Sequence, residues 1–130
     1  MTVISYRKKR ESVEQCAYFT WLNLSPLPCR AHAFAIPNGG TRHQLEAYNL
    51  KKQGVKPGVS DVFVAYPAHG FYGLWLEFKV NKNKLTPLQK DWLHEMRSQG
   101  YAAYVVYSWA EAIKITKDYC DGRCECQSIP

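Results

Sequence analysis

Two acidic residues and a lysine near the middle of the chain have the types and spacing that metal-dependent phosphate chemistry requires. Asp61 opens the apolar segment 61–66, and Glu77 and Lys79 alternate with apolar residues in the segment 72–79. Carboxylate oxygens on adjacent strands can hold Mg²⁺, with water and substrate phosphate completing the octahedron. Lys79 would position or deprotonate a water beside that ion. The pattern therefore predicts a metal site, although an exposed Glu–Lys pair on a sheet face would give the same pattern.

The two segments predict a β-hairpin that brings these carboxylates together. If the loop 67–71 is centred on His69, Tyr66 faces Tyr72 and Asp61 faces Glu77. Directly opposed residues have Cβ atoms about 4.5–5.5 Å apart, and like charges there are destabilising unless something compensates them. Alternation also divides the second segment into two faces, one with Leu74, Leu76 and Phe78 and the other with Trp75, Glu77 and Lys79.

Periodicity and turn residues predict the elements around the hairpin. Helices are expected over 12–24, 42–53, 87–99 and 109–119, and further strands over 33–36 and 102–107. Ser12 and Gln15 form a capping-box pattern for the first helix. Its expected apolar stripe is Val13, Cys16, Ala17, Thr20, Trp21 and Leu24. Thr86 is expected to cap the third helix, with the stripe Leu88, Trp92, Leu93 and Met96.

These elements predict an α/β fold, a small mixed sheet flanked by helices. The strand–helix–strand unit from Leu74 to Tyr107 should be a right-handed parallel crossover. With 130 residues, the chain is expected to form one domain over 12–119, after a basic arm at 1–11 and before a cysteine-containing tail at 120–130.

Charge and composition narrow the class of protein. The net charge is +6, and it arises in residues 1–60, which contain nine basic and three acidic side chains. Such a basic half suggests a face for a polyanion, most often nucleic acid, although a solvated basic surface has the same composition. No apolar stretch has the length of a signal peptide core or a membrane span, so an intracellular, cytoplasmic protein is expected.

The cysteines leave two alternatives. Their number is five, which is odd, and Cys120, Cys124 and Cys126 lie close together near the C-terminus. Reduced thiols are the expectation. A zinc site would need a fourth ligand from Cys16, Cys29 or a histidine.

The motifs, taken in order, resemble the VRR-NUC domain of the PD-(D/E)xK nuclease superfamily. The resemblance covers roughly residues 12–107. It rests on Glu14, Ile36-Pro37-Asn38-Gly39-Gly40, Gly54-Val55-x-x-Gly58-x-x-Asp61, Leu76-Glu77-Phe78-Lys79 and Leu85-Thr86-Pro87-Leu88-Gln89. Ser60 stands where the family often has proline, and the cysteine tail has no counterpart in the family pattern.

The resemblance implies a restriction-endonuclease-like αβββαβ core and metal-dependent hydrolysis of phosphodiester bonds in DNA. It implies that Asp61, Glu77 and the carbonyl of Phe78 bind Mg²⁺ or Mn²⁺, and that Lys79 orients the nucleophile. Glu14 would be an outer or second-metal carboxylate, although an acid in the first turn of a helix is favourable in itself. Gln89 would lie near the active site, although its spacing from Thr86 also fits a capping box.

Candidate contacts to DNA phosphates come from the basic segments. Asn38, Gly39, Gly40 and Arg42 could admit a phosphate, or form a plain turn, and the lysines expected to bind DNA are Lys51, Lys52, Lys56, Lys82 and Lys84. One site cuts one strand at a time, so a paired cut predicts a homodimer. Stand-alone members of the family resemble enzymes that resolve four-way (Holliday) junctions. A general or nicking endonuclease and a non-catalytic DNA-binding module are the alternatives; the isolated histidines disfavour a ββα-metal nuclease.

Overall fold

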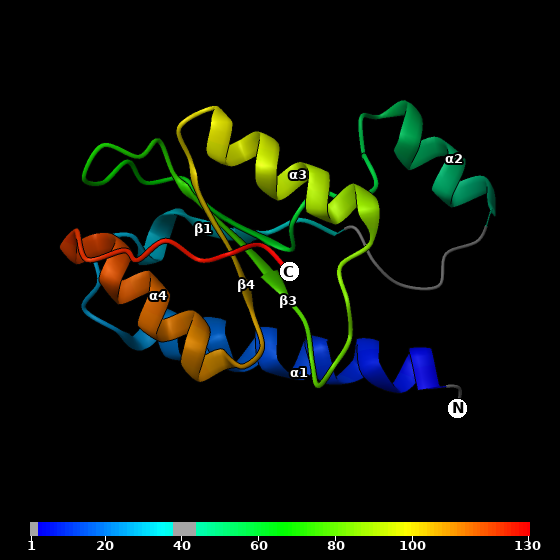
Figure 1. Cartoon of the computed structure of the whole chain (residues 1–130). Helices are drawn as coiled ribbons and strands as arrows, with labels where there is room; N and C mark the ends of the chain where they lie inside the picture. Colours follow the sequence, from blue (N-terminus) through cyan, green and yellow to red (C-terminus); the bar gives the residue numbers. More distant parts are fainter. Residues whose placement is uncertain (1–2, 38–43) are drawn as a thin grey trace.

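A four-stranded mixed sheet organises the computed structural model, which describes residues 3–37 and 44–130 (Figure 1). The strand order is β1-β2-β3-β4, with β1 (Ala33–Ala35), β2 (Val62–Val64) and β3 (Leu74–Phe78) antiparallel and β4 (Ala102–Val106) parallel to β3. The helices are α1 (Val3–Leu24), α2 (Gln44–Lys52), α3 (Pro87–Ser98) and α4 (Trp109–Asp121), and a 3₁₀ turn spans Arg30–His32. The expected α/β fold with a parallel crossover from β3 to β4 is confirmed.

The hairpin has the register that the sequence predicts. Val62 pairs with Leu76, Phe63 with Trp75 and Val64 with Leu74. The paired part is shorter than the segments expected from the sequence. Extending the register by one residue places Asp61, which directly precedes β2, opposite Glu77 near the end of β3.

The sheet separates two apolar clusters, as the alternation along β3 requires. Leu74, Leu76 and Phe78 pack with Tyr18 and Leu22 of α1 and with residues of α4. Trp75 packs on the other face with Leu93 of α3. In Figure 1, α1 and α4 accordingly cover one side of the sheet and α3 the other. Glu77 and Lys79 share the Trp75 face.

The first helix differs from its expectation in both start and buried face. It begins at Val3, so Ser12 is interior and cannot be an N-cap, and the segment expected as a basic arm continues this helix. Its fully buried residues are Tyr18 and Leu22, whereas Val13 and Leu24 are 61% and 85% exposed. The predicted stripe is confirmed at Trp21, which packs partly buried against the core, but it missed Tyr18, whose ring packs against Phe78. On α3, Leu93 is buried as expected, but Leu88 is exposed.

The C-terminal segment covers the outer edge of β4. The Gln127 side-chain amide accepts a hydrogen bond from Val105 N–H at 3.0 Å and donates one to Val105 O at 2.9 Å, which imitates a neighbouring strand. Arg97 donates to Gln127 O, and Tyr104 O–H donates to Glu125 O. Cys120 belongs to α4, where its Sγ lies 3.2 Å from Sγ of buried Cys29. Among the described residues, no helix combines the length and apolar character needed to cross a membrane.

Gly58, three residues before Asp61, packs closely against the first turn of α3. Its φ is +90°, and a Cβ added there would lie 2.7 Å from Cβ of Leu88 and 2.8 Å from Leu88 backbone atoms. That first turn of α3 is fixed by reciprocal capping, with Gln89 N–H donating to the Thr86 hydroxyl and Thr86 N–H donating to the Gln89 carbonyl. The close approach therefore requires glycine.

We expect Gly58→Ala to destabilise the protein more than Gly54→Ala. Both positions have positive φ, which costs about 1–2 kcal/mol for alanine, but a Cβ at Gly54 meets nothing within 4 Å. The contact with Leu88 should add about 1–3 kcal/mol at Gly58. Chemical denaturation of both variants measures the difference, and equal losses would show that the α3 contact adjusts without cost.

Candidate active site

Asp61 is held between β1 and the end of β3. Its backbone carbonyl accepts a hydrogen bond from Ile36 N–H at 2.7 Å. Its Oδ2 accepts one from Phe78 N–H at 2.8 Å. These bonds at both ends of the residue fix the carboxylate beside the last residues of β3, where Glu77 lies.

Glu77 buries a carboxyl group next to that of Asp61. The residue is 2% exposed, and its Oε1 has no hydrogen-bond partner among the described residues. Burial raises the pKa of the Glu77 carboxyl well above its usual range, and the hydrogen bond and negative charge of Asp61 raise it further. In the metal-free protein, a proton shared between the two carboxyls is therefore favoured.

Lys79 supplies the positive charge of this cluster. It is 6% exposed, although lysine is rarely buried without a compensating partner. Its backbone N–H donates to Val106 O at 2.9 Å, which ties it to the end of β4. Its charge lowers the pKa of Glu77, opposing the effect of Asp61.

The donor set fits a hard divalent cation such as Mg²⁺ or Mn²⁺. Two adjacent carboxylates, one of them with an unpartnered buried oxygen, provide anionic ligands, and Mg²⁺ is commonly held by one or two carboxylates together with water and substrate phosphate. Within residues 3–37 and 44–130, no group of three or more His, Cys, Asp or Glu is arranged to hold a metal ion. The described part of the chain thus gives no cluster for the zinc alternative, and an ion at Asp61 and Glu77 would depend on water and backbone oxygens.

Glu14 and Glu11 differ in what they contact. Glu14 Oε2 accepts a hydrogen bond from Trp109 N–H at 2.9 Å, at the N-terminus of α4. Glu11, nearly one helical turn earlier, accepts a hydrogen bond from Asn83 Nδ2 at 2.9 Å and raises the pKa of Glu77. Sequence reasoning missed Glu11 because it began the helix at Ser12. The available signal was the spacing of 7 and 11 residues from the buried Tyr18 and Leu22.

Gln89 forms the capping box that its spacing predicts, so its side-chain carbonyl is already engaged with Thr86 N–H. A catalytic role for Gln89 stays a prediction.

The residues expected to contact DNA are distributed unevenly. Asn38, Gly39, Gly40 and Arg42 lie outside the described residues. Those that the structure describes are all exposed: Lys51 and Lys52 on α2, Lys56 after it, and Lys82 and Lys84 in the loop between β3 and α3. Lys52 Nζ lies 4.8 Å from the centroid of the Tyr48 ring.

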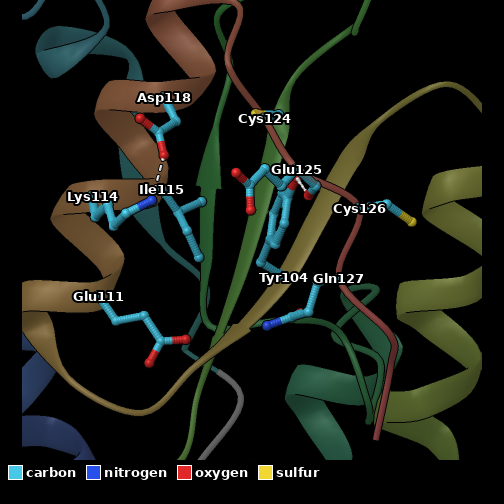
Figure 2. A pocket seen from close by; sticks show the side chains of 9 residues that line it. All are labelled: Tyr104, Glu111, Lys114, Ile115, Asp118, Cys124, Glu125, Cys126 and Gln127. Carbon is cyan, nitrogen blue, oxygen red and sulfur yellow. Dashed lines mark hydrogen bonds and ion pairs between the residues drawn. The ribbon is translucent and has the colours of Figure 1, made fainter.

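A concave region on the opposite side of β4 is unsuited to DNA. Its volume is about 290 Å³. Figure 2 shows the side chains that line it, which come from α4, β4 and the C-terminal segment. Three carboxylates line it, those of Glu111, Asp118 and Glu125, and only Lys114 adds a positive charge. Lys114 is already paired with Asp118 at 2.8 Å. The negative side chains would repel a phosphate backbone.

Two comparisons with known proteins found a match. The family model described as the VRR-NUC domain matches residues 2–110. A solved structure described as a VRR_NUC domain protein has a TM-score of 0.73 and 23% sequence identity, and the alignment covers 85% of this chain and 88% of that chain. At that identity the structural likeness shows the fold. No curated protein matched the chain.

We expect Glu77→Gln to raise the melting temperature of the metal-free protein. Glutamine keeps the shape of the side chain and can donate its amide hydrogen to Asp61, and it stays neutral without taking up the proton that the buried Glu77 carboxyl requires. A gain of about 1 kcal/mol corresponds to about 3–6 °C for a domain of this size. Thermal unfolding in EDTA measures the shift.

Glu14→Gln is the matched control, because it makes the same chemical change at the N-terminus of α4. There the negative charge is favourable, so this variant should melt at a lower temperature. A decrease for Glu77→Gln in EDTA would contradict the view that the carboxylate pair is destabilising without a cation.

Proposed function

The chain belongs to the VRR-NUC family, and from that premise we propose that it is a metal-dependent endonuclease that cuts branched DNA as a homodimer. Family membership indicates a nuclease that processes DNA. The dependence on Mg²⁺ or Mn²⁺, the branched substrate and the dimer are our proposals.

The observation that carries the metal dependence is the buried, unpartnered Oε1 of Glu77 beside Asp61. A structural carboxyl at this depth would normally have its oxygens satisfied by protein donors. Here the neighbouring group is another carboxyl, so a bound cation would stabilise the pair by offsetting the repulsion between the two negative charges. Asp61 and Glu77 would hold the ion, and the Phe78 carbonyl at the same strand end is a candidate third ligand.

A bound Mg²⁺ or Mn²⁺ supplies two things to phosphodiester hydrolysis: it stabilises charge on the phosphoryl oxygens, and it makes a bound water more acidic. Lys79 shares the sheet face with Glu77 and would orient the attacking water and neutralise the scissile phosphate. Its burial restricts the side chain, which favours such a positioning role over a loose phosphate contact.

Glu11 fits the outer carboxylate role better than Glu14 does. Its charge acts on Glu77, and its bond to Asn83 attaches α1 to the loop that follows Lys79. Glu14 is engaged at the start of α4. We therefore assign to Glu11 the position next to the carboxylate pair.

The substrate and assembly follow from having one small domain with one site. One D…ExK site hydrolyses one phosphodiester bond at a time, whereas a paired cut in a four-way junction needs two sites related by twofold symmetry. A homodimer provides both. The exposed lysines of α2 and of the loop after β3 would contact phosphates without reading the sequence.

We expect Asp61→Asn and Lys79→Ala each to lower cleavage by at least about 100-fold while binding to DNA is retained. Asp61→Asn removes a charged metal ligand, and Lys79→Ala removes a group acting at the reacting phosphate. Single-turnover cleavage of labelled DNA with Mg²⁺, Mn²⁺ or EDTA, alongside binding in EDTA, separates turnover from affinity.

Lys52→Ala serves as the contrasting variant. It should weaken binding and reduce its salt dependence, with little effect on the rate of bound substrate. Cleavage that is unchanged in EDTA would contradict the metal dependence. Absence of cleavage by the unmodified protein with either metal would favour the non-catalytic DNA-binding module.

We also expect the protein to be a dimer of about 30 kDa that cuts a four-way junction faster than a linear duplex of equal length, since two sites must act together. Light scattering at micromolar concentration, with and without DNA, measures the mass. A mass of about 15 kDa in both conditions would contradict the dimer. Equal cleavage of junction and duplex at matched salt would instead indicate a general or nicking endonuclease.

A further inference from the structure

A second cavity begins two residues after Lys79. It has a volume of about 480 Å³ and is lined by the loop 81–85, Lys90 of α3, Tyr107 and Pro130. Tyr107 directly follows Val106, whose carbonyl bonds to Lys79 N–H. The cavity therefore lies at the same end of the sheet as Glu77 and Lys79, which are near the end of β3. Its size lies in the range of about 300–1,000 Å³ typical of small-molecule sites.

The loop that forms its wall is held in place on three sides. Asn83 N–H donates to Val80 O at 3.1 Å, which closes a turn over the buried Val80. Asn81 takes a left-handed conformation within this turn, with φ of 52°. The Asn83 side chain donates a hydrogen bond to Glu11 on α1. The loop ends at Thr86, which is the N-cap of α3. The wall is therefore preorganised.

The lining combines positive charge with an aromatic ring. Lys82, Lys84 and Lys90 contribute three ammonium groups, and no Asp or Glu side chain of the described residues lines the cavity. Tyr107 is 38% exposed, so part of its ring is available. The cavity of Figure 2 has the reverse composition, with three carboxylates. Lysines that neutralise phosphate and an aromatic ring that stacks on a base are the two contacts that single-stranded nucleic acid uses.

We propose that this cavity binds an unpaired nucleotide of the DNA substrate, with its base against Tyr107 and its phosphates near Lys82, Lys84 and Lys90. The inference rests on the proposed function and refines its substrate to branched DNA in which a base at the branch point, beside the scissile phosphate, is unpaired. A base inside a duplex is paired and stacked, and its face is not available to a side chain. An unpaired base at a branch point can offer its face at no further cost of unstacking.

Binding in EDTA tests this independently of cleavage. Fluorescence anisotropy compares a blunt duplex with the same duplex carrying a short single-stranded arm, and thymidine monophosphate serves as the free nucleotide. We expect the arm to increase affinity. Tyr107→Ala should remove that increase, a loss of about 5- to 150-fold, and leave blunt-duplex binding within about twofold. Tyr107→Phe should retain it, because the aromatic ring remains.

Two control variants make the same kinds of chemical change at residues outside the cavity. Trp109→Ala removes another exposed aromatic ring, 41% exposed and two residues further along the chain. Lys114→Ala removes one lysine from the acidic cavity. Both should keep the preference for the arm. The double variant Lys82→Ala/Lys84→Ala should weaken arm binding and reduce the salt slope by about one for each phosphate that is no longer neutralised.

The outcomes separate this inference from the nuclease proposal. A preference for the arm that depends on Tyr107, without cleavage in Mg²⁺ or Mn²⁺, would support the cavity and overturn the nuclease. Cleavage with no preference for the arm, or with equal losses for Tyr107→Ala and Trp109→Ala, would overturn the cavity assignment alone. Micromolar binding of thymidine monophosphate that requires Tyr107, with no effect of the arm, would overturn the DNA strand as its ligand.

Discussion

The carboxyl group of Glu77 is buried beside that of the half-buried Asp61, where both cannot be charged without compensation. Burial and mutual repulsion raise the pKa of Glu77, and a lysine on the same strand only partly offsets them. The surrounding structure maintains this unfavourable arrangement. The β2–β3 register opposes the two residues, and Phe78 N–H fixes one carboxylate. A fold that maintains such a pair at a strand end suits the proposed divalent cation, which would convert the repulsion into a binding site.

Local sequence determines the hairpin and therefore most of the candidate site. Strict alternation in 72–79 assigns each side chain of β3 to a face, and a loop centred on His69 fixes the register, so the opposition of Asp61 and Glu77 could be predicted. The capping box at Thr86 and Gln89 is equally local, and it appears as its spacing requires. These features depend on neighbours in sequence or on one tight connection, which is why a single sequence reveals them.

Features that depend on distant packing could not be read in the same way. The face that α1 buries is decided by Tyr18, which packs against Phe78 and shares a hydrogen bond with the Thr116 hydroxyl of α4. Neither partner is near it in sequence. The expected apolar stripe therefore missed the two fully buried side chains of α1, Tyr18 and Leu22, and the expected helix start at Ser12 concealed Glu11. The Gln127 amide on the edge of β4 likewise has no periodic signature, because one side chain replaces a strand.

Positive and negative side chains gather at different places on the protein, which determines where a polyanion would bind. The formal charge of +6 arises entirely from residues 1–60. Residues 61–130 have no net charge, but their positive and negative side chains mainly line different cavities. Lysines line the cavity after β3, and carboxylates line the cavity between α4 and the C-terminal segment. The lysines would attract a phosphate backbone to the first cavity, and the carboxylates would repel it from the second. The first cavity lies just after the end of β3, so the same charges would also guide DNA towards the proposed site at Asp61, Glu77 and Lys79.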